Sequence, residues 1–361
     1  MHERRGALMK KILKDEQGQT IIEYALVLSF FVLAFTIAMP PLRTATVAAF
    51  SRMADQLNME IQDAFILPPG WNEGEDTSSG SNEPWFPPEL NLYDENVIYS
   101  AENVTLTGSS KIFGNVVTNG SLVASGSSYV DGTVWENANH EWNFPMPVFP
   151  SISSDDLPNQ GSLRLSGGAG VHTISESGYY SSIELLSNKS ITIDTGNEGD
   201  VLTLLVDNLD VAQGHINLVG DGKLILKVNN TFSFGGSSTL NSSGLSKNVI
   251  MYYSGQDSLE FFGNTHYNGS IYTQTSGARF GGSTTIVGSV MVAGEQVYVS
   301  DGGTANLNDA LLYAPNADLR LVGNASIEGR IIANSITGIG NSTIKFKPID
   351  ISDDFYWEIE G

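Results

Sequence analysis

Residues 269–292 read GSIYTQTSGARFGGSTTIVGSVMV, and this stretch holds the unit that decides the fold of most of the chain. A small residue leads into a short apolar strand at Gly269, and the same form returns 19 residues later at Gly288. Such starts follow one another at spacings of 21, 19, 21 and 20 residues: Asn248, Gly269, Gly288, Asp309 and Gly329. Val, Ile, Tyr and Thr favour strands, and Gly and Asn tolerate the sharp turns between them.

A period near 20 with two or three short strands is the length of one coil of a β-solenoid, in which each coil buries an apolar column against the next. The same form recurs less regularly upstream, for example at residues 115–118 and 200–206. We therefore predict an all-β domain over residues 91–361, as a right-handed parallel β-helix, with a β-sandwich as the alternative. The Pro-rich residues 135–158 are expected to leave the solenoid, and residues 350–361 to cap its last coil.

The N-terminal part of the chain predicts a long α-helix instead. Residues 21–39 are apolar except for Glu23, Ser29 and Thr36. Nineteen residues of helix are about 28 Å long, which is enough to cross the hydrocarbon core of a membrane. A carboxylate in such a helix costs roughly 2.5–3.5 kcal/mol, so Glu23 indicates a function.

Two prolines and a change of pattern follow the apolar run. Pro40 and Pro41 are expected to kink the helix because proline removes a backbone donor and clashes with the preceding turn. Residues 42–67 continue as an amphipathic helix, which packs either on its own domain or on neighbouring subunits. Residues 68–90 are rich in Pro, Gly, Ser and Glu and predict a linker.

Residues 18–25, GQTIIEYA, resemble the class III signal of type IV pilin-like proteins, and among these the Tad/Flp-type pilins most closely. The resemblance implies that residues 1–18 are a leader, cut after Gly18 by a prepilin peptidase so that Gln19 becomes the first residue. It implies that residues 19–67 anchor the precursor in the membrane and later form the core of a filament. Glu23, within the Glu23-Tyr24 pair of the motif, would then meet the amine of Gln19 of a neighbour. Typical Flp-type pilins are very small, so the large C-terminal domain leaves room for a minor pilin or pseudopilin.

Charge and composition limit the partners. The chain has 40 acidic and 18 basic residues, a net charge of −22, and no cysteine. The leader carries 5 basic and 3 acidic residues, which leaves −24 on residues 19–361. So acidic a chain is a poor nucleic-acid binder, and it has neither disulfides nor thiolate metal sites. The basic leader is expected to stay cytoplasmic while the rest faces outward.

Candidates for catalysis are sparse. The five histidines, at positions 2, 140, 172, 215 and 266, lack the spacing of metal ligands, so no metal or cofactor is expected. Parallel β-helices do host polysaccharide lyases and hydrolases, whose sites use clustered carboxylates with Lys or Arg. The nearest such group is Asp207, Asp210 and Asp221 with Lys223.

The sequence therefore predicts a non-enzymatic structural subunit of an extracellular pilus-like filament. Its membrane-anchored precursor would meet a prepilin peptidase and a pilus assembly machinery, and would then form a helical homo-oligomer that displays the solenoid for adhesion. The alternatives are an anchored adhesin that never polymerises and, less favoured, an anchored carbohydrate-active enzyme.

Overall fold

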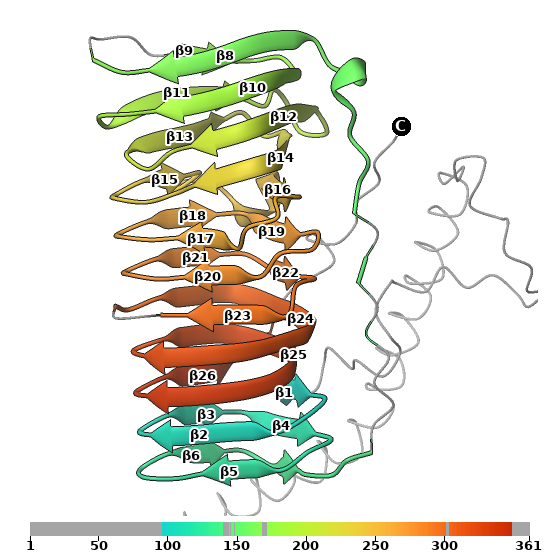
Figure 1. Cartoon of the computed structure of the whole chain (residues 1–361), viewed down its shortest axis with the longest axis vertical. Coiled ribbons are helices and arrows are strands. Elements are labelled where there is room, and N and C mark those ends of the chain that lie inside the picture. The colour runs from blue at the N-terminus through green and yellow to red at the C-terminus, as the bar shows by residue number, and fades with distance from the viewer. Residues whose placement is uncertain are drawn as a thin grey trace, which may run out of the picture. The chain divides into compact units, whose positions relative to one another are not determined.

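The structure is a computed structural model that describes residues 96–139, 144, 146–147, 149–167, 172–300 and 303–348. All of them belong to one compact unit, Glu83–Gly361. They form a stack of coils whose strands pair in parallel with the strands of the coils above and below (Figure 1). Each coil contributes strands to three faces, which we call face 1, face 2 and face 3.

Face 1 begins with four strands that also run on into face 2: β8 (Asn159–Leu165), β10 (Gly178–Leu185), β12 (Val201–Asp210) and β14 (Lys223–Ser233). Short strands continue it: β16 (Val249–Tyr253), β19 (Ser270–Thr273) and β22 (Val290–Val292). The stack then reaches β24 (Asn306–Gly323) and β25 (Ser326–Gly340), which bend around all three faces, and ends with β1 (Asn96–Ser100), β4 (Asn115–Thr118) and β7 (Val134–Trp135).

Faces 2 and 3 are built from short strands. Face 2 adds β17 (Leu259–Phe261), β20 (Ala278–Phe280), β23 (Gln296–Val299), β2 (Val104–Gly108) and β5 (Leu122–Ala124). Face 3 comprises β9 (His172–Ile174), β11 (Lys189–Asp194), β13 (Gly214–Val219), β15 (Thr239–Leu240), β18 (His266–Asn268), β21 (Thr285–Val287), β26 (Thr343–Phe346), β3 (Lys111–Phe113) and β6 (Tyr129–Asp131). Two 3-10 helices, η1 (Ser154–Asp156) and η2 (Ser246–Asn248), lie in connections.

The order of the coils differs from the order of the sequence. The first coils of the chain form the far end of the stack, because β1 pairs with β25 and β3 pairs with β26. The chain then leaves the stack after β7 and starts again at β8 at the opposite end. The described residues between 136 and 158, which we call the strap, lie along the outside of the stack (Figure 1). Figure 1 shows the described parts of the strap, in green, running from the coil of β5 and β6 to that of β8. From β8 the chain winds back until it meets β1.

The interior is a set of ladders of apolar side chains. On face 3 the inward position is occupied in successive coils by aliphatic residues with one tyrosine: Ile191, Ile216, Leu240, Tyr267, Ile286, Leu307, Ile327, Ile344 and Ile112. All are buried and belong to one cluster. On face 2, Phe261 packs between Phe234 and Phe280, with ring centroids 5.2 and 5.5 Å away. Strand alternation puts every second side chain in this core.

A second apolar cluster lies outside face 1, beneath the strap. Phe149 of the strap contacts Tyr252 and Tyr272, with ring centroids 5.4 and 5.1 Å apart. Phe144 lies 6.3 Å from Tyr99 and 6.5 Å from Tyr313. Face 1 therefore buries apolar side chains on both of its sides.

The predicted fold class needs a correction. The described residues form strands, turns and two short 3-10 helices, with no α-helix among them, so the predicted long N-terminal helix is not seen. The predicted helical residues 19–67, including the span 21–39 and the continuation 42–67, lie outside the described residues. The solenoid part of the prediction is confirmed. The β-sandwich alternative is wrong because the strands pair in parallel from coil to coil.

Two details of the prediction also have outcomes. The described residues between 136 and 158 leave the solenoid, as expected, but Trp135, the predicted first residue of this excursion, still belongs to β7 and pairs with Val117. The predicted cap would cover the coil that contains β26. That coil is already covered by the first coils of the chain, because β26 pairs with β3. Residues 350–361, the predicted cap, lie outside the described residues.

Candidate functional site

The residues predicted to act in processing and assembly cannot be placed. Gly18, Gln19, Glu23 and Tyr24, together with the proline pair 40–41, lie outside the described residues. Among the residues that are described, no helix has the length and apolar character needed to cross a membrane.

The structure separates the carboxylates proposed for catalysis. Lys223 pairs with Val201 at the start of β12, whereas Asp207 lies six residues further along that strand. At about 3.3 Å per residue the two are about 20 Å apart along the strand. Asp221 adjoins Lys223, and Asp210 lies at the far end of β12, so the group does not converge.

Asp207 and Asp210 have structural hydrogen bonds instead. Asp207 accepts from the Tyr179 hydroxyl at 2.6 Å and from Asn229 Nδ2 at 2.9 Å. The bond to Asp207, with some burial, raises the pKa of the Tyr179 phenol. Asp210 Oδ1 accepts from the Ala212 backbone N–H at 3.0 Å. These carboxylates hold neighbouring coils and a turn in place.

Two histidines that are far apart in sequence come close in the fold. His215 and His266 face outward on face 3 and are separated by a single coil, whose Thr239 lies between them in register. His215 Nδ1 is 3.0 Å from Thr239 Oγ1. The described residues contain no group of three or more His, Asp or Glu side chains that could hold a metal ion.

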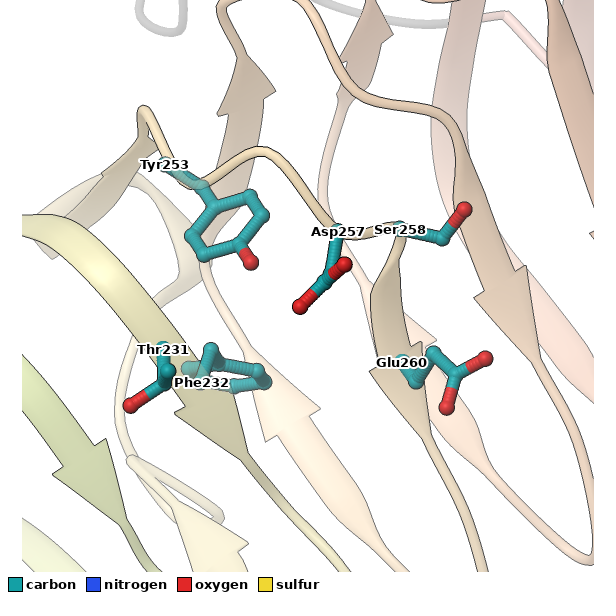
Figure 2. Close-up of a pocket in the computed structure, with 6 residues that line it drawn as sticks. All are labelled: Thr231, Phe232, Tyr253, Asp257, Ser258 and Glu260. Atoms are coloured by element: carbon teal, nitrogen blue, oxygen red, sulfur yellow. The ribbon is translucent and has the colours of Figure 1, made fainter.

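A pocket of about 420 Å³ opens at the corner between faces 1 and 2. It forms where the strand path changes: β14 runs straight across the corner, but in the next coil β16 stops at Tyr253 and a loop leads to β17. Gly255 lets this loop close, since a Cβ there would lie 2.2 Å from the Asn230 carbonyl oxygen. Figure 2 shows the six lining residues: Thr231, Phe232, Tyr253, Asp257, Ser258 and Glu260.

The pocket combines an aromatic wall with two acids. Phe232 lies 6.4 Å from Tyr253, ring to ring, and the Tyr253 hydroxyl donates to the Asn230 carbonyl at 3.3 Å. Burial, with a contribution from Asp257 and Glu260, raises the pKa of Tyr253. In Figure 2 the Asp257 carboxylate lies near the phenol. The arrangement can accept hydrogen bonds or hold a cation beside aromatic rings, but no base and nucleophile are paired in its lining.

The sequence analysis missed this pocket because its residues come from two stretches, 231–232 and 253–260. They become neighbours only because β14 and β16 lie in adjacent coils and pair with each other. A search for aromatic and acidic residues one coil length apart would have found the aromatic pair, but the corner loop breaks the register for the acids.

Comparison with known proteins identifies a family without a known activity. Residues 115–306 match the family described as "Domain of unknown function (DUF7305)". No curated protein matches the chain. Among solved structures, an ice binding protein from an Antarctic Biological Consortium is similar at 16% identity and a TM-score of 0.26, over 75% of this chain and 96% of that one. At these values the likeness carries no argument about function.

Proposed function

The chain belongs to the family described as "Domain of unknown function (DUF7305)", and we propose, from the N-terminal sequence rather than from this family, that it is a pilin-like structural subunit that carries a β-solenoid on an extracellular filament. In this proposal the solenoid is a displayed binding module, and the protein works by assembly rather than by turnover of a substrate.

One observation carries the proposal. The residues GQTIIEYA at positions 18–25 are preceded by a basic segment and followed by an apolar run that ends at Met39. A carboxylate at Glu23, five residues into the chain that would start at Gln19, is costly in an apolar surrounding unless a positive group pairs with it. The free amine of a neighbouring subunit would supply that group.

The way in which the chain enters the solenoid supports display on an anchor. The first described residue, Asn96, begins β1, and β1 pairs with β25 on one edge and with β4 on the other. Val97 and Ile98 are fully buried. A pull applied through the residues before Asn96 would therefore act on a strand that is held on both edges, rather than on a free end of the stack.

The arrangement of polar residues favours binding over catalysis. Asp207 and Asp210 are committed to hydrogen bonds within the stack, whereas Lys223 begins β14 and Asp221 lies in the turn before it. An anchored enzyme would need acids and bases within reach of one reacting group.

The decisive experiment is the mass of the N-terminal peptide of protein sheared from the surface of its native cells. We expect a mature chain that starts at Gln19. A chain that starts at Met1 and occurs only in the membrane fraction would refute the proposal. The Glu23→Ala variant should lose filaments while its membrane insertion persists. Ser29→Ala, in the same apolar run, is the matched control and should assemble normally.

A further inference from the structure

Face 3 presents one continuous row of outward side chains, one from each successive coil, which we call the face-3 row. The strand register places them side by side in this order: Ser190, His215, Thr239, His266, Thr285, Asn306, Ser326, Thr343, Lys111 and Tyr129. Nine of them are half-buried and Tyr129 is exposed. The row follows the same strands as the inward aliphatic ladder, one residue out of phase, as alternation along a strand requires.

The face-3 row contains no carboxylate, although the chain has 40 acidic residues. In the middle coils the next outward positions, Asn217, Val287 and Asn308, also lack one. The corresponding row on face 2 is mixed in charge and includes Glu184, Asp210, Glu260, Arg279 and Arg320. The middle of face 3 is therefore less charged than face 2, and the carboxylates on its strands, Asp194, Glu328 and Asp131, lie outside the row and away from its middle coils.

The other two faces are less suited to a side-by-side contact. Face 1 is covered by the strap, whose Phe144 and Phe149 already occupy its apolar surface. Face 2 carries the acidic pocket that includes Asp257 and Glu260. Mature subunits of net charge −24 repel one another, so a contact costs least where like charges do not meet.

The chemistry of the row is complementary to itself. Thr, Ser, Asn and neutral His each donate and accept hydrogen bonds, so the row of one molecule can satisfy the same row of another across a two-fold axis. The middle of the row has no Trp, Tyr or Phe on which a sugar ring could stack. A second copy therefore fits this surface better than a neutral polysaccharide does.

The size of the surface suits a small contact. Nine steps of about 4.8 Å between strands make the row about 43 Å long. Most of its strands have about three residues and are about 10 Å long, so the row offers on the order of 430 Å², about half of the roughly 800 Å² that each partner buries in an interface of standard size.

We propose that face 3 is a contact surface for a second copy of this chain, with two displayed solenoids packed face to face across a two-fold axis. The inference rests on the proposed function for its setting, but the contact can be tested separately from filament formation.

Because the chain has no cysteine, a single introduced thiol reports its own surroundings. Full-length Thr285→Cys and Asn306→Cys variants are produced in native cells, treated with a short bismaleimide, and separated by mass on denaturing gels. Thr337→Cys, a half-buried threonine on the face-2 part of β25, is the matched control. We expect a band of twice the subunit mass for the face-3 variants and monomer for the control.

Each result decides a separate point, because the N-terminal residue is measured in the same samples. Sheared chains that start at Gln19 without a face-3 dimer, or with equal dimer in the control, would overturn the contact while the filament stands. Dimer in the membrane fraction, without mature sheared chains, would support the contact and refute the filament. A cross-linked band of any other mass would assign face 3 to a different partner and overturn the inference.

A charge variant tests the electrostatic reason for the contact. Thr285→Glu added to Asn306→Cys places two carboxylates near a two-fold axis, so the dimer yield should fall about tenfold. Thr337→Glu added to Asn306→Cys should leave the yield unchanged. Equal yields in both double variants would contradict the argument from charge.

Discussion

At the scale of single residues, Tyr272 joins the strap to the stack. It is 6% exposed, its ring contacts Phe149, and its hydroxyl donates to the Pro147 carbonyl oxygen. Desolvation by burial raises the pKa of Tyr272 to about 12. The neutral phenol is thus favoured in the folded chain, and the stability that it contributes is complete below the ordinary tyrosine pKa of about 10 and is lost as the pH rises through 12.

The Tyr272→Phe variant tests this account. At neutral pH we expect it to be less stable than the parent by about 1 kcal/mol, because the Pro147 carbonyl loses its donor. Since Phe cannot ionise, that difference should shrink between pH 10 and pH 12, where the unfolded parent gains phenolate. Urea unfolding at a series of pH values measures it. A difference that stays constant up to pH 12 would show that the phenol is not desolvated in the folded protein.

At the scale of elements, the strap closes face 1 and bridges the two ends of the stack. The Lys227 ammonium donates to the carbonyl oxygens of Pro150 and Ile152, at 3.3 and 3.4 Å, and lies 5.7 Å from the centroid of the Phe149 ring. Burial lowers the pKa of Lys227. The middle of the strap is thus held by aromatic packing and by a desolvated cation.

Phe149→Ala should therefore release the middle of the strap. We expect a loss of about 2 kcal/mol, less than for a fully buried Phe because the side chain is only partly covered. Limited proteolysis should then cut within residues 136–158 while the solenoid remains intact. Phe262→Ala, at a phenylalanine that is 39% exposed, serves as the control and should change neither measurement much. Unchanged proteolysis of Phe149→Ala would mean that other contacts hold the strap.

At the scale of the whole molecule, the stack is closed by residues far apart in the chain. Ile98 of β1 pairs in register with Ile331 of β25, and Thr343 of β26 pairs with Lys111 of β3. The last coils of the chain thus complete the first ones. One edge of each of β1, β2 and β3 therefore has no pairing strand until β25 and β26 are in place.

Hydrogen exchange on the Ile331→Ala variant tests this closure. The substitution removes a fully buried side chain, at a cost of about 3 kcal/mol, and should speed exchange in β1 and β25 together. Ile193→Ala, equally buried in β11, is the control and should affect β9 and β13 but leave β1 unchanged. Fast exchange in β25 with β1 still protected would contradict the shared closure.

The sequence by itself determined the coil. Small residues before apolar strands at intervals of 19 to 21 residues, starting at Asn248, predict the solenoid, and Gly and Asn mark its corners, since inward and outward alternation and turn chemistry are local properties. The prolines between residues 145 and 158 likewise predicted that this segment leaves the solenoid. The predictions for residues 18–41 remain predictions, because they fall outside the described residues.

Only the tertiary structure decided the order of the coils and what meets on their surfaces. A parallel strand edge offers much the same hydrogen bonds to any neighbouring strand, so the local pattern cannot tell that β1 follows β25. For the same reason His215 and His266 lie near each other in one row, and Asp257 and Phe232 line one pocket. Asp207 and Lys223, by contrast, lie far apart along their strands. Which side chains share a face depends on the stacking register, and that register is fixed by the burial of the whole ladder at once.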